Sequence, residues 1–488
     1  MNFAKSVKNA INPTNDMKRT ENGAIAFEKS GGGALLDFFA VAGSLRPRTE
    51  ADIATKFAAA FAEDKLLATK MLFWVGNVRG GAGERRTFRI CLKWLANNYP
   101  HIAKYNIHNI PYFNRWDSLY ELVGTPCEAA MWEFVKGTIT DDLKNMAKNK
   151  PVSLAAKWLK SENSSSAETK RLARKTRHAL SLSARDYRKI LSKLRAYIDV
   201  TECKMSAQEW NEIHYPSVPS YAMKNYNKAF KKHDGARFSV YLDSVKSGKT
   251  KINASTLYPY DLVHKASYGG YDEVVEAQWR ALPNYVEGEN NILVMADVSG
   301  SMYGRPIETS IGLATYFAER NTGDYHNLYM TFTNKPNFVT LDGCNSFYDK
   351  VQRVKRTNIG YSTNLMAAFD YILDHAVRNH ISNKDIPKAL VVVSDMEIDP
   401  YFCPGRNFTF LETLRLKFAV AGYSLPKLVL WNVEARNDTF LTKDEDVILV
   451  SGQSPSIFRE LCANLNGKTA WDMMLEVLNN PVYDVVIV

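Results

Sequence analysis

A short apolar run that ends in an acidic, hydroxyl-rich motif is the strongest constraint in this sequence. The run Asn291–Ala296 has the length and composition of a buried strand, and it leads directly into the pentapeptide DVSGS, which begins at Asp297. The order of residues places Asp297, Ser299 and Ser301 at the carboxyl end of a strand, where open α/β sheets bind ligands. Oxygen-bearing side chains gathered at such a point predict a site for a hard divalent cation.

The pattern of the chain changes near residue 290, and the change predicts two domains. From Ala34 to Trp279 the sequence is a succession of helical segments separated by polar or Gly/Pro breaks. Beyond them, short apolar runs alternate with amphipathic helices; the runs are Asn291–Ala296, Leu328–Phe332, Ala389–Val393, Leu428–Trp431 and Val447–Val450. We therefore expect an N-terminal extension over residues 1–33, a mostly α domain over 34–283 and an α/β domain over 291–488.

Two further stretches of the α/β part supply groups that a divalent cation would still need. Thr363 lies in the polar loop 357–365, which opens a helix, and Asp395 follows the apolar run 390–394. If both lie beside the first strand, three hydroxyls and two carboxylates meet around one ion. The alternative is that the pentapeptide only caps the helix that follows it.

This order of strand, D-x-S-x-S, distant Thr and distant Asp resembles the metal-ion-dependent adhesion site of von Willebrand factor A domains. The resemblance implies that Ser299, Ser301 and Thr363 bind Mg²⁺ or Mn²⁺ directly, and that Asp297 and Asp395 bind it directly or through water. It also implies a Rossmann-like α/β fold for this domain. Such an ion keeps an open coordination position for an external carboxylate or phosphate.

The same motif disfavours several enzyme classes. A haloacid-dehalogenase-type phosphatase needs a second carboxylate two residues after the first, and that position is Ser299. A serine hydrolase would have Gly-x-Ser-x-Gly and a positioned histidine. A metal-dependent nuclease would have the carboxylate cluster of a two-metal site. We expect a protein that is not an enzyme.

Charge is distributed unevenly along the chain. Residues 1–290 carry 44 basic and 30 acidic side chains, a net of +14, whereas residues 291–488 carry 18 and 22, a net of −4. A basic domain of this kind predicts a polyanionic partner, either nucleic acid or an acidic protein.

Two basic clusters are candidates for phosphate contacts. One lies between Glu168 and Arg195, and the other follows a Gly-rich corner at 79–86. The candidate residues are Lys170, Arg171, Arg174, Lys175, Arg177, His178, Arg185, Arg188, Lys189, Arg79, Arg85 and Arg86. The alternative is a solvated helix face. Tyr187 and Tyr197 would stack on bases if they are exposed.

A basic helical region followed by a von Willebrand A domain resembles the Ro autoantigen (TROVE) family. The segments VRGGAGER at 78–85, YFNRWD at 112–117 and KNYNKAF at 224–230 are similar to a branch of TROVE-like proteins found in plants, large viruses and phages. The resemblance implies HEAT-like helical repeats that form a ring or horseshoe, joined by the A domain. It further implies that structured RNA binds the basic outer surface and single-stranded ends enter the hole.

Our expectation is a non-enzymatic RNA-binding protein of the Ro type with a divalent-metal site. The alternative is a metal-dependent adhesion or assembly module, such as a viral or phage structural factor, whose metal takes a carboxylate from a protein partner. No apolar run has the length of a membrane span, and the six cysteines form no C-x-x-C pair. These features lead us to expect a cytoplasmic monomer with no membrane partner.

Overall fold

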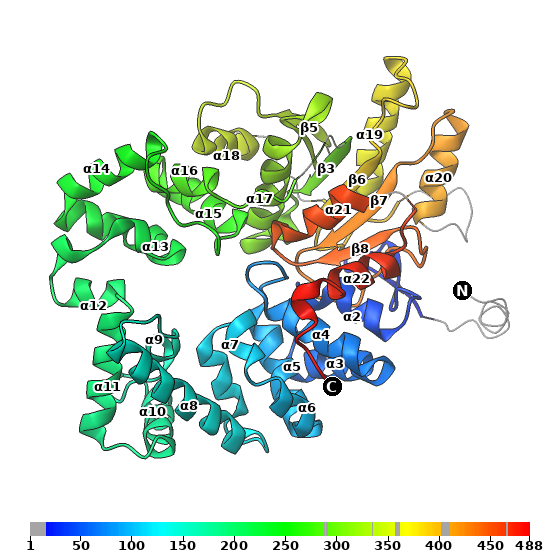
Figure 1. The fold of residues 1–488 in the computed structure, drawn as a ribbon. Coiled ribbons are helices and arrows are strands. Elements are labelled where there is room, and N and C mark those ends of the chain that lie inside the picture. Colours follow the sequence, from blue (N-terminus) through cyan, green and yellow to red (C-terminus); the bar gives the residue numbers. More distant parts are fainter. Residues whose placement is uncertain are drawn as a thin grey trace.

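The computed structural model of the protein describes residues 16–286, 288, 291–333, 335–356, 362–401, 410–464 and 467–488. It is mostly helical, with an N-terminal helical region and a C-terminal region built on a six-stranded mixed sheet (Figure 1). This arrangement confirms the expected combination of a helical part and an α/β part. None of the described helices combines the length and the apolar character needed to cross a membrane.

The N-terminal region opens with a small hairpin and continues as helices. The hairpin pairs β1 (Met17–Arg19) with β2 (Ile25–Phe27), in a segment predicted only as an N-terminal extension. The helices are α2 (Ala34–Ala42), α3 (Glu50–Glu63), α4 (Lys65–Gly76), α5 (Arg85–Asn98), α6 (Pro100–Tyr105), α7 (Asn109–Phe113), α8 (Glu128–Ala147), α9 (Ala155–Trp158), α10 (Ala167–Ala179), α11 (Ala184–Tyr197), α12 (Thr201–Ser206), α13 (Ser220–His233), α14 (Gly235–Lys246), α15 (Pro259–Gly269) and α16 (Glu273–Arg280). Short 3-10 turns lie at η1 (Trp116–Leu122), η2 (Trp210–Glu212) and η3 (Tyr215–Ser217).

The C-terminal region contains the five predicted strands and one further edge strand. The strands are β3 (Ile292–Asp297), β4 (Leu328–Phe332), β5 (Asn337–Thr340), β6 (Ala389–Ser394), β7 (Lys427–Asn432) and β8 (Ile448–Ser451). Its helices are α17 (Arg305–Arg320), α18 (Phe347–Arg356), α19 (Leu365–Arg378), α20 (Phe410–Val420), α21 (Phe458–Asn464) and α22 (Ala470–Leu478). The 3-10 turns of this region are η4 (Gly300–Met302), η5 (Gly323–Tyr325), η6 (Pro455–Ile457) and η7 (Pro481–Tyr483).

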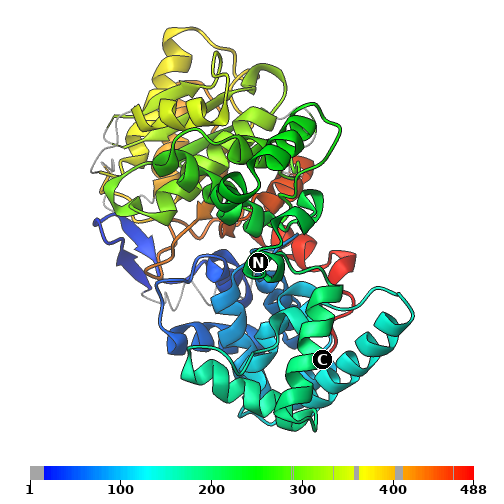
Figure 2. The same ribbon diagram turned by 90° about the vertical axis from the view of Figure 1, so that its left-hand side faces the viewer.

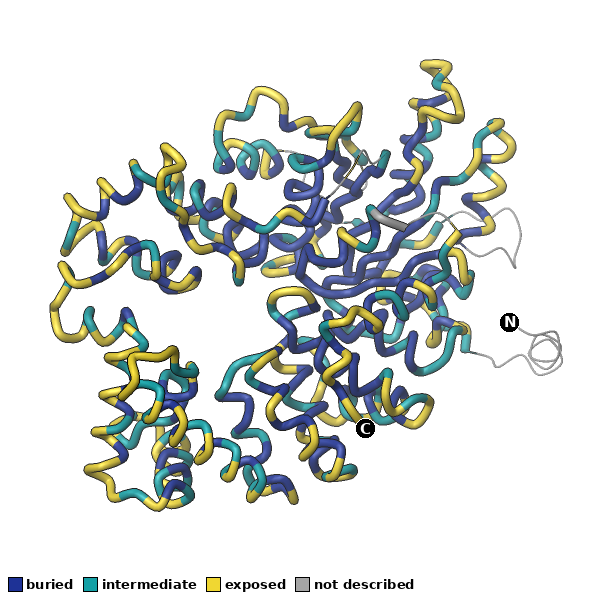
Figure 3. The backbone as a smooth tube through the Cα atoms, in the orientation of Figure 1, coloured by how far each residue is buried: buried dark blue, intermediate teal, exposed yellow. Residues whose placement is uncertain are grey.

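The strand order sets where a ligand can bind. The order is β5-β4-β3-β6-β7-β8, in which only β5 is antiparallel to its neighbour. The chain runs outward from β3 in one direction to β4 and in the other to β6, so the order reverses between β3 and β6. In a doubly wound sheet, the crevice at the carboxyl ends of two such strands is the usual ligand position. Every residue of β3 and β6 is buried, and Figure 3 shows these central strands in the colour of buried residues.

The helical region contacts the sheet region at both of its ends. At its start, α2 packs on β8 and α22, and at its end α15 packs along α17. Between these points α8 to α11 lie at the end of the molecule remote from the sheet, and α15 and α16 lie back beside the sheet region, with α13 and α14 on their outer side (Figures 1 and 2). The two ends also touch directly, because the Tyr258 hydroxyl donates to the Val78 carbonyl at 3.2 Å and the Tyr285 hydroxyl to the Arg79 carbonyl at 2.9 Å.

One hydrophobic core spans both predicted domains. It includes Phe39 and Trp74 of the helical region together with Val294 and Trp431 of the sheet. A second, smaller core centres on Tyr215, Phe230 and Phe238 and holds α13 and α14 together. The sequence boundary at residues 283–290 is therefore a change of pattern, and hydrophobic packing continues across it.

Candidate metal site and basic surface

The pentapeptide and the end of β6 meet at the carboxyl edge of the sheet. Asp297 is fully buried; its carboxylate accepts a hydrogen bond from the Ser299 amide at 2.9 Å and from the Ser394 hydroxyl at 2.5 Å. The hydroxyls of Ser299 and Ser301 lie 3.1 Å apart. Because β3 and β6 are adjacent and parallel, the residues that follow them necessarily share this edge. The structure therefore brings Asp297, Ser299 and Ser301 together, as the sequence predicts.

Asp395 joins the same cluster and carries an unpredicted partner. Its carboxylate is buried, accepts the Glu397 amide at 3.1 Å and forms an ion pair with Arg436 at 2.5 Å. Arg436 follows β7, the next parallel strand, and its guanidinium also donates to the Ser301 carbonyl at 3.3 Å. The guanidinium thus lies between the strand-end aspartate and the serine loop.

Burial raises the pKa of both strand-end carboxylates. Burial, followed by the negative charge of Asp395, raises the pKa of Asp297 to about 7. Burial also raises the pKa of Asp395, although the Glu397 amide and the Arg436 charge oppose that rise. A site in which two carboxylates resist ionisation is one that a cation stabilises, because the cation favours the charged forms.

Thr363 lies inside the protein beside the chain that follows Asp395. Its backbone carbonyl accepts the Asp399 amide at 3.0 Å, and its side chain is buried. The Thr363 hydroxyl oxygen has no hydrogen-bond partner among the described residues. A buried hydroxyl without a partner is costly, and a bound ion or water would satisfy it. Residues 357–361 of the predicted loop lie outside the described residues.

The side-chain oxygens at this site suit Mg²⁺ or Mn²⁺, and they come from hydroxyls as well as from carboxylates. Within the described ranges, no group of three or more His, Cys, Asp and Glu side chains is arranged to hold a metal ion. Hydroxyl and carboxylate oxygens are the ligands that Mg²⁺ and Mn²⁺ accept. The Ser299 and Ser301 hydroxyls are adjacent, and the buried, unpartnered Thr363 hydroxyl would be a third such ligand if an ion draws it to them.

Sequence reasoning missed three residues of this cluster. Ser394 precedes Asp395, and its hydroxyl donates a hydrogen bond to the Asp297 carboxylate. Glu397 is buried, and its carboxylate accepts hydrogen bonds from Asn437 and Thr439, each at 3.1 Å. Arg436 was also missed. Its only sequence signal is that it follows the run Leu428–Trp431, so the shared edge of parallel strands places it near Asp395.

The predicted basic cluster on α10 and α11 divides into paired and unpaired side chains. Arg171 pairs with Glu168 at 2.7 Å, Lys175 with Glu128 at 3.0 Å and Arg177 with Glu162 at 2.9 Å. In the described part of the chain, no ion pair involves the exposed side chains of Lys170, Arg174, His178, Arg185, Arg188 and Lys189. These six make up what we term the α10–α11 basic surface. Tyr187 is buried and donates to the Lys160 carbonyl, which removes it as a stacking residue, whereas Tyr197 is 37% exposed.

The Gly-rich corner before α5 is mainly structural. Arg86 donates to the carbonyls of Arg46 and Arg48, and Arg46 pairs with the buried Glu84. Partial burial, followed by the charge of Arg115, lowers the pKa of Arg85, whose side chain still reaches solvent. Of the predicted Arg79, Arg85 and Arg86, Arg85 is therefore the one in a cationic environment suited to a phosphate.

Further exposed lysines lie on α13 and were not predicted. Lys228, Lys231 and Lys232 have the i, i+3, i+4 spacing of one helix face, and all three are exposed. The signal was present in the sequence as the run KAFKKH at 228–233.

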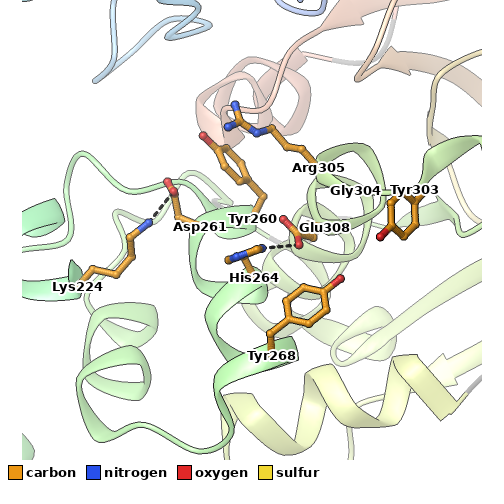
Figure 4. A pocket seen from close by; sticks show the side chains of 9 residues that line it. All are labelled: Lys224, Tyr260, Asp261, His264, Tyr268, Tyr303, Gly304, Arg305 and Glu308. Atoms are coloured by element: carbon orange, nitrogen blue, oxygen red, sulfur yellow. Dashed lines mark hydrogen bonds and ion pairs between the residues drawn. The ribbon is translucent and has the colours of Figure 1, made fainter. Parts of the chain in front are cut away.

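A hollow of about 540 Å³ lies between α13, α15 and the start of α17 (Figure 4). It is lined by Lys224, Tyr260, Asp261, His264, Tyr268, Tyr303, Gly304, Arg305 and Glu308. Lys224 pairs with Asp261 at 2.8 Å, and His264 contacts Glu308 at 2.7 Å. Its lining residues come from both the helical region and the sheet region, and Tyr303 lies two residues after Ser301 in the sequence.

Comparison with known proteins shows similarity along the whole chain. Residues 291–472 match a family described as "Domain of unknown function (DUF7788)". An uncharacterised protein of Acanthamoeba polyphaga mimivirus is 29% identical over 517 aligned positions, which cover 95% of this chain and 88% of that protein. A second family, described as "Domain of unknown function (DUF2828)", matches residues 20–115 and 136–291. Because this last match spans more than half of the sequence, the chain belongs to the DUF2828 family.

Proposed function

We propose that this protein binds RNA through its helical region, without cleaving it, and that the C-terminal region is a von Willebrand A-type domain with a divalent-metal site. The observation that carries the proposal is the α10–α11 basic surface, whose exposed cations have no carboxylate partner within the described residues. Unpaired cations on neighbouring helices are free to neutralise successive phosphates. A helical path that leaves the sheet and returns to it supports the Ro-like ring.

The test is the salt dependence of RNA binding. We expect the affinity for a labelled single-stranded RNA, measured by fluorescence anisotropy, to fall steeply between low and physiological salt. The double variant Lys170→Glu/Arg174→Glu reverses two exposed charges one helical turn apart. It should reduce the slope of log affinity against log salt by about 1.4, because each phosphate contact on a single strand contributes about 0.7.

A matched control separates surface recognition from net charge. The variant Arg378→Glu/Lys384→Glu changes the net charge equally on an exposed part of the sheet region, and it should bind RNA like the wild type. Affinity that is independent of salt, or equal loss in both double variants, would contradict the proposed surface. Incubation of the same RNA with Mg²⁺ tests the non-enzymatic role, and defined cleavage fragments would overturn it.

The second candidate function is metal-dependent capture of a protein, as an adhesion or assembly module. It is favoured by the cluster of Asp297, Ser299 and Ser301 and by the buried Thr363 hydroxyl, which has no hydrogen-bond partner among the described residues. In this role Ser299, Ser301 and Thr363 would hold Mg²⁺ or Mn²⁺, and the ion would supply an electrophilic position for a carboxylate of the partner. Asp297→Ala should then abolish partner capture while RNA binding survives, whereas loss of both would favour a single shared site.

A further inference from the structure

Arg436 places a positive charge beside a buried carboxylate of the candidate metal site. Its guanidinium lies 2.5 Å from the buried Asp395 carboxylate and 3.5 Å from the Glu21 carboxylate of the N-terminal hairpin. Its Nε is buried and has no hydrogen-bond partner among the described residues. The side chain is therefore held at this point by charge more than by a complete set of hydrogen bonds.

The hairpin that carries Glu21 is fastened to the chain directly after Asp395. The Thr20 hydroxyl donates to the Ile398 carbonyl at 2.7 Å, and the Glu21 amide donates to the Glu397 carboxylate at 2.5 Å. The Asn22 side chain donates to the Glu397 carbonyl at 2.6 Å. These bonds hold the turn between β1 and β2 against residues 397 and 398, two and three positions after Asp395.

A divalent ion and Arg436 would share the same carboxylate. Asp297 and Asp395 would both face a bound ion, and in its absence the guanidinium pairs with Asp395. An ion of charge +2 that reaches Asp395 meets repulsion from a guanidinium a few ångströms away, in a buried site where screening is weak. Arg436 must therefore lower the affinity of the site for a metal.

We propose that Arg436 is a built-in cation that competes with the divalent ion for Asp395 and couples the metal site to the N-terminal hairpin. The inference rests on the proposed metal site. Without a metal, Arg436 bridges Asp395 and Glu21 and the hairpin is closed over the site edge. When a metal engages Asp395, the guanidinium gives up that ion pair and the hairpin loosens.

The experiment is a calorimetric titration of the full chain with Mn²⁺ alone. Arg436→Gln keeps a polar side chain but removes the charge, and it should bind Mn²⁺ at least tenfold more tightly than the wild type. Arg436→Lys retains the charge and should resemble the wild type. The matched control is Arg415→Gln, which removes an arginine paired with Asp444 elsewhere in the same region and should leave the affinity unchanged.

Hydrogen–deuterium exchange of residues 16–28 supplies a second readout. We expect Mn²⁺ to speed amide exchange at Glu21 in the wild type, and the Arg436→Gln variant to exchange rapidly there with or without Mn²⁺. Equal affinity in the wild type and Arg436→Gln, or weaker binding in the variant, overturns the inference and leaves the metal site standing. No Mn²⁺ binding in any variant, Arg436→Gln included, overturns the metal site itself.

Discussion

Asp297 shows how one buried side chain links the fold to the chemistry of the site. It ends the central strand β3, so neighbouring strands remove it from water on both sides. Hydrogen bonds from Ser299 and Ser394 compensate only part of the cost of a buried charge, and the nearby Asp395 adds repulsion. The ionised form of Asp297 is therefore unfavourable whenever no cation is bound.

This unfavourable ionisation predicts an unusual pH dependence for the metal-free protein. The pKa of Asp297 is about 7 in the folded protein, against about 3.9 in the unfolded chain, so between these values the folded state holds a proton that the unfolded state has lost. The free energy of unfolding should then fall as pH rises from 4 to 7, by at most about 4 kcal/mol from this group. Asp297→Asn should remove this dependence.

Thermal melts in EDTA at pH 4.5 and pH 8 check the prediction. At pH 8 we expect Asp297→Asn to melt above the wild type, and at pH 4.5 the two should converge. Added Mg²⁺ should raise the wild-type melting temperature at pH 8 and leave the variant unchanged. Asp374→Asn, which alters an exposed carboxylate on α19, serves as the control. The control retains Asp297 and should follow the wild type. A wild-type melting temperature that does not fall from pH 4.5 to pH 8 would exclude a neutral buried Asp297.

At the scale of the element, apolar runs and caps were predictable, and short edge pieces were not. The five buried strands were found because parallel strands covered on both faces are continuous apolar runs. The edge strand β5 (NFVT) has four residues, and each strand of the hairpin has three, which is too short for periodicity to distinguish from loop. The hairpin depends on the distant Phe27 to Phe440 pairing, which no local pattern contains.

The start of α11 provides an element-scale prediction. Ser183 caps this helix: its hydroxyl accepts the Asp186 amide at 3.1 Å. Ser183→Ala should reduce the stability of the helix by about 1 kcal/mol. Hydrogen–deuterium exchange of the first turn measures this as faster exchange at residues 184–188. Ser192→Ala in the same helix keeps the cap and should not speed that exchange; equal effects in both variants would count against the cap.

At the scale of the whole molecule, the contact between α2 and β8 could not be predicted from the sequence. Gly43 ends α2, and its amide donates to the Ser451 hydroxyl at 3.0 Å, across 408 residues of chain. The candidate site residues were predictable because strand ends converge by a general rule. The packing of α2 and α15 against the sheet region depends on complementary side-chain shapes, which produce no periodic pattern in the sequence.

Gly43 therefore makes the closure of the molecule testable. A Cβ at this position would lie 2.6 Å from the Ser451 carbonyl oxygen and 2.7 Å from the Gly452 Cα, both backbone atoms, while the φ of −77° is acceptable for alanine. Gly43→Ala should destabilise the protein by at least about 2 kcal/mol, because α2 must move away from β8. Gly137 lies within α8 with nothing near its Cβ position, so Gly137→Ala should instead stabilise by up to about 1 kcal/mol. Thermal and urea unfolding of the two variants compares a glycine-to-alanine change at the α2–β8 contact with the same change within α8. Stabilisation of both would mean that α2 and β8 are not held in contact.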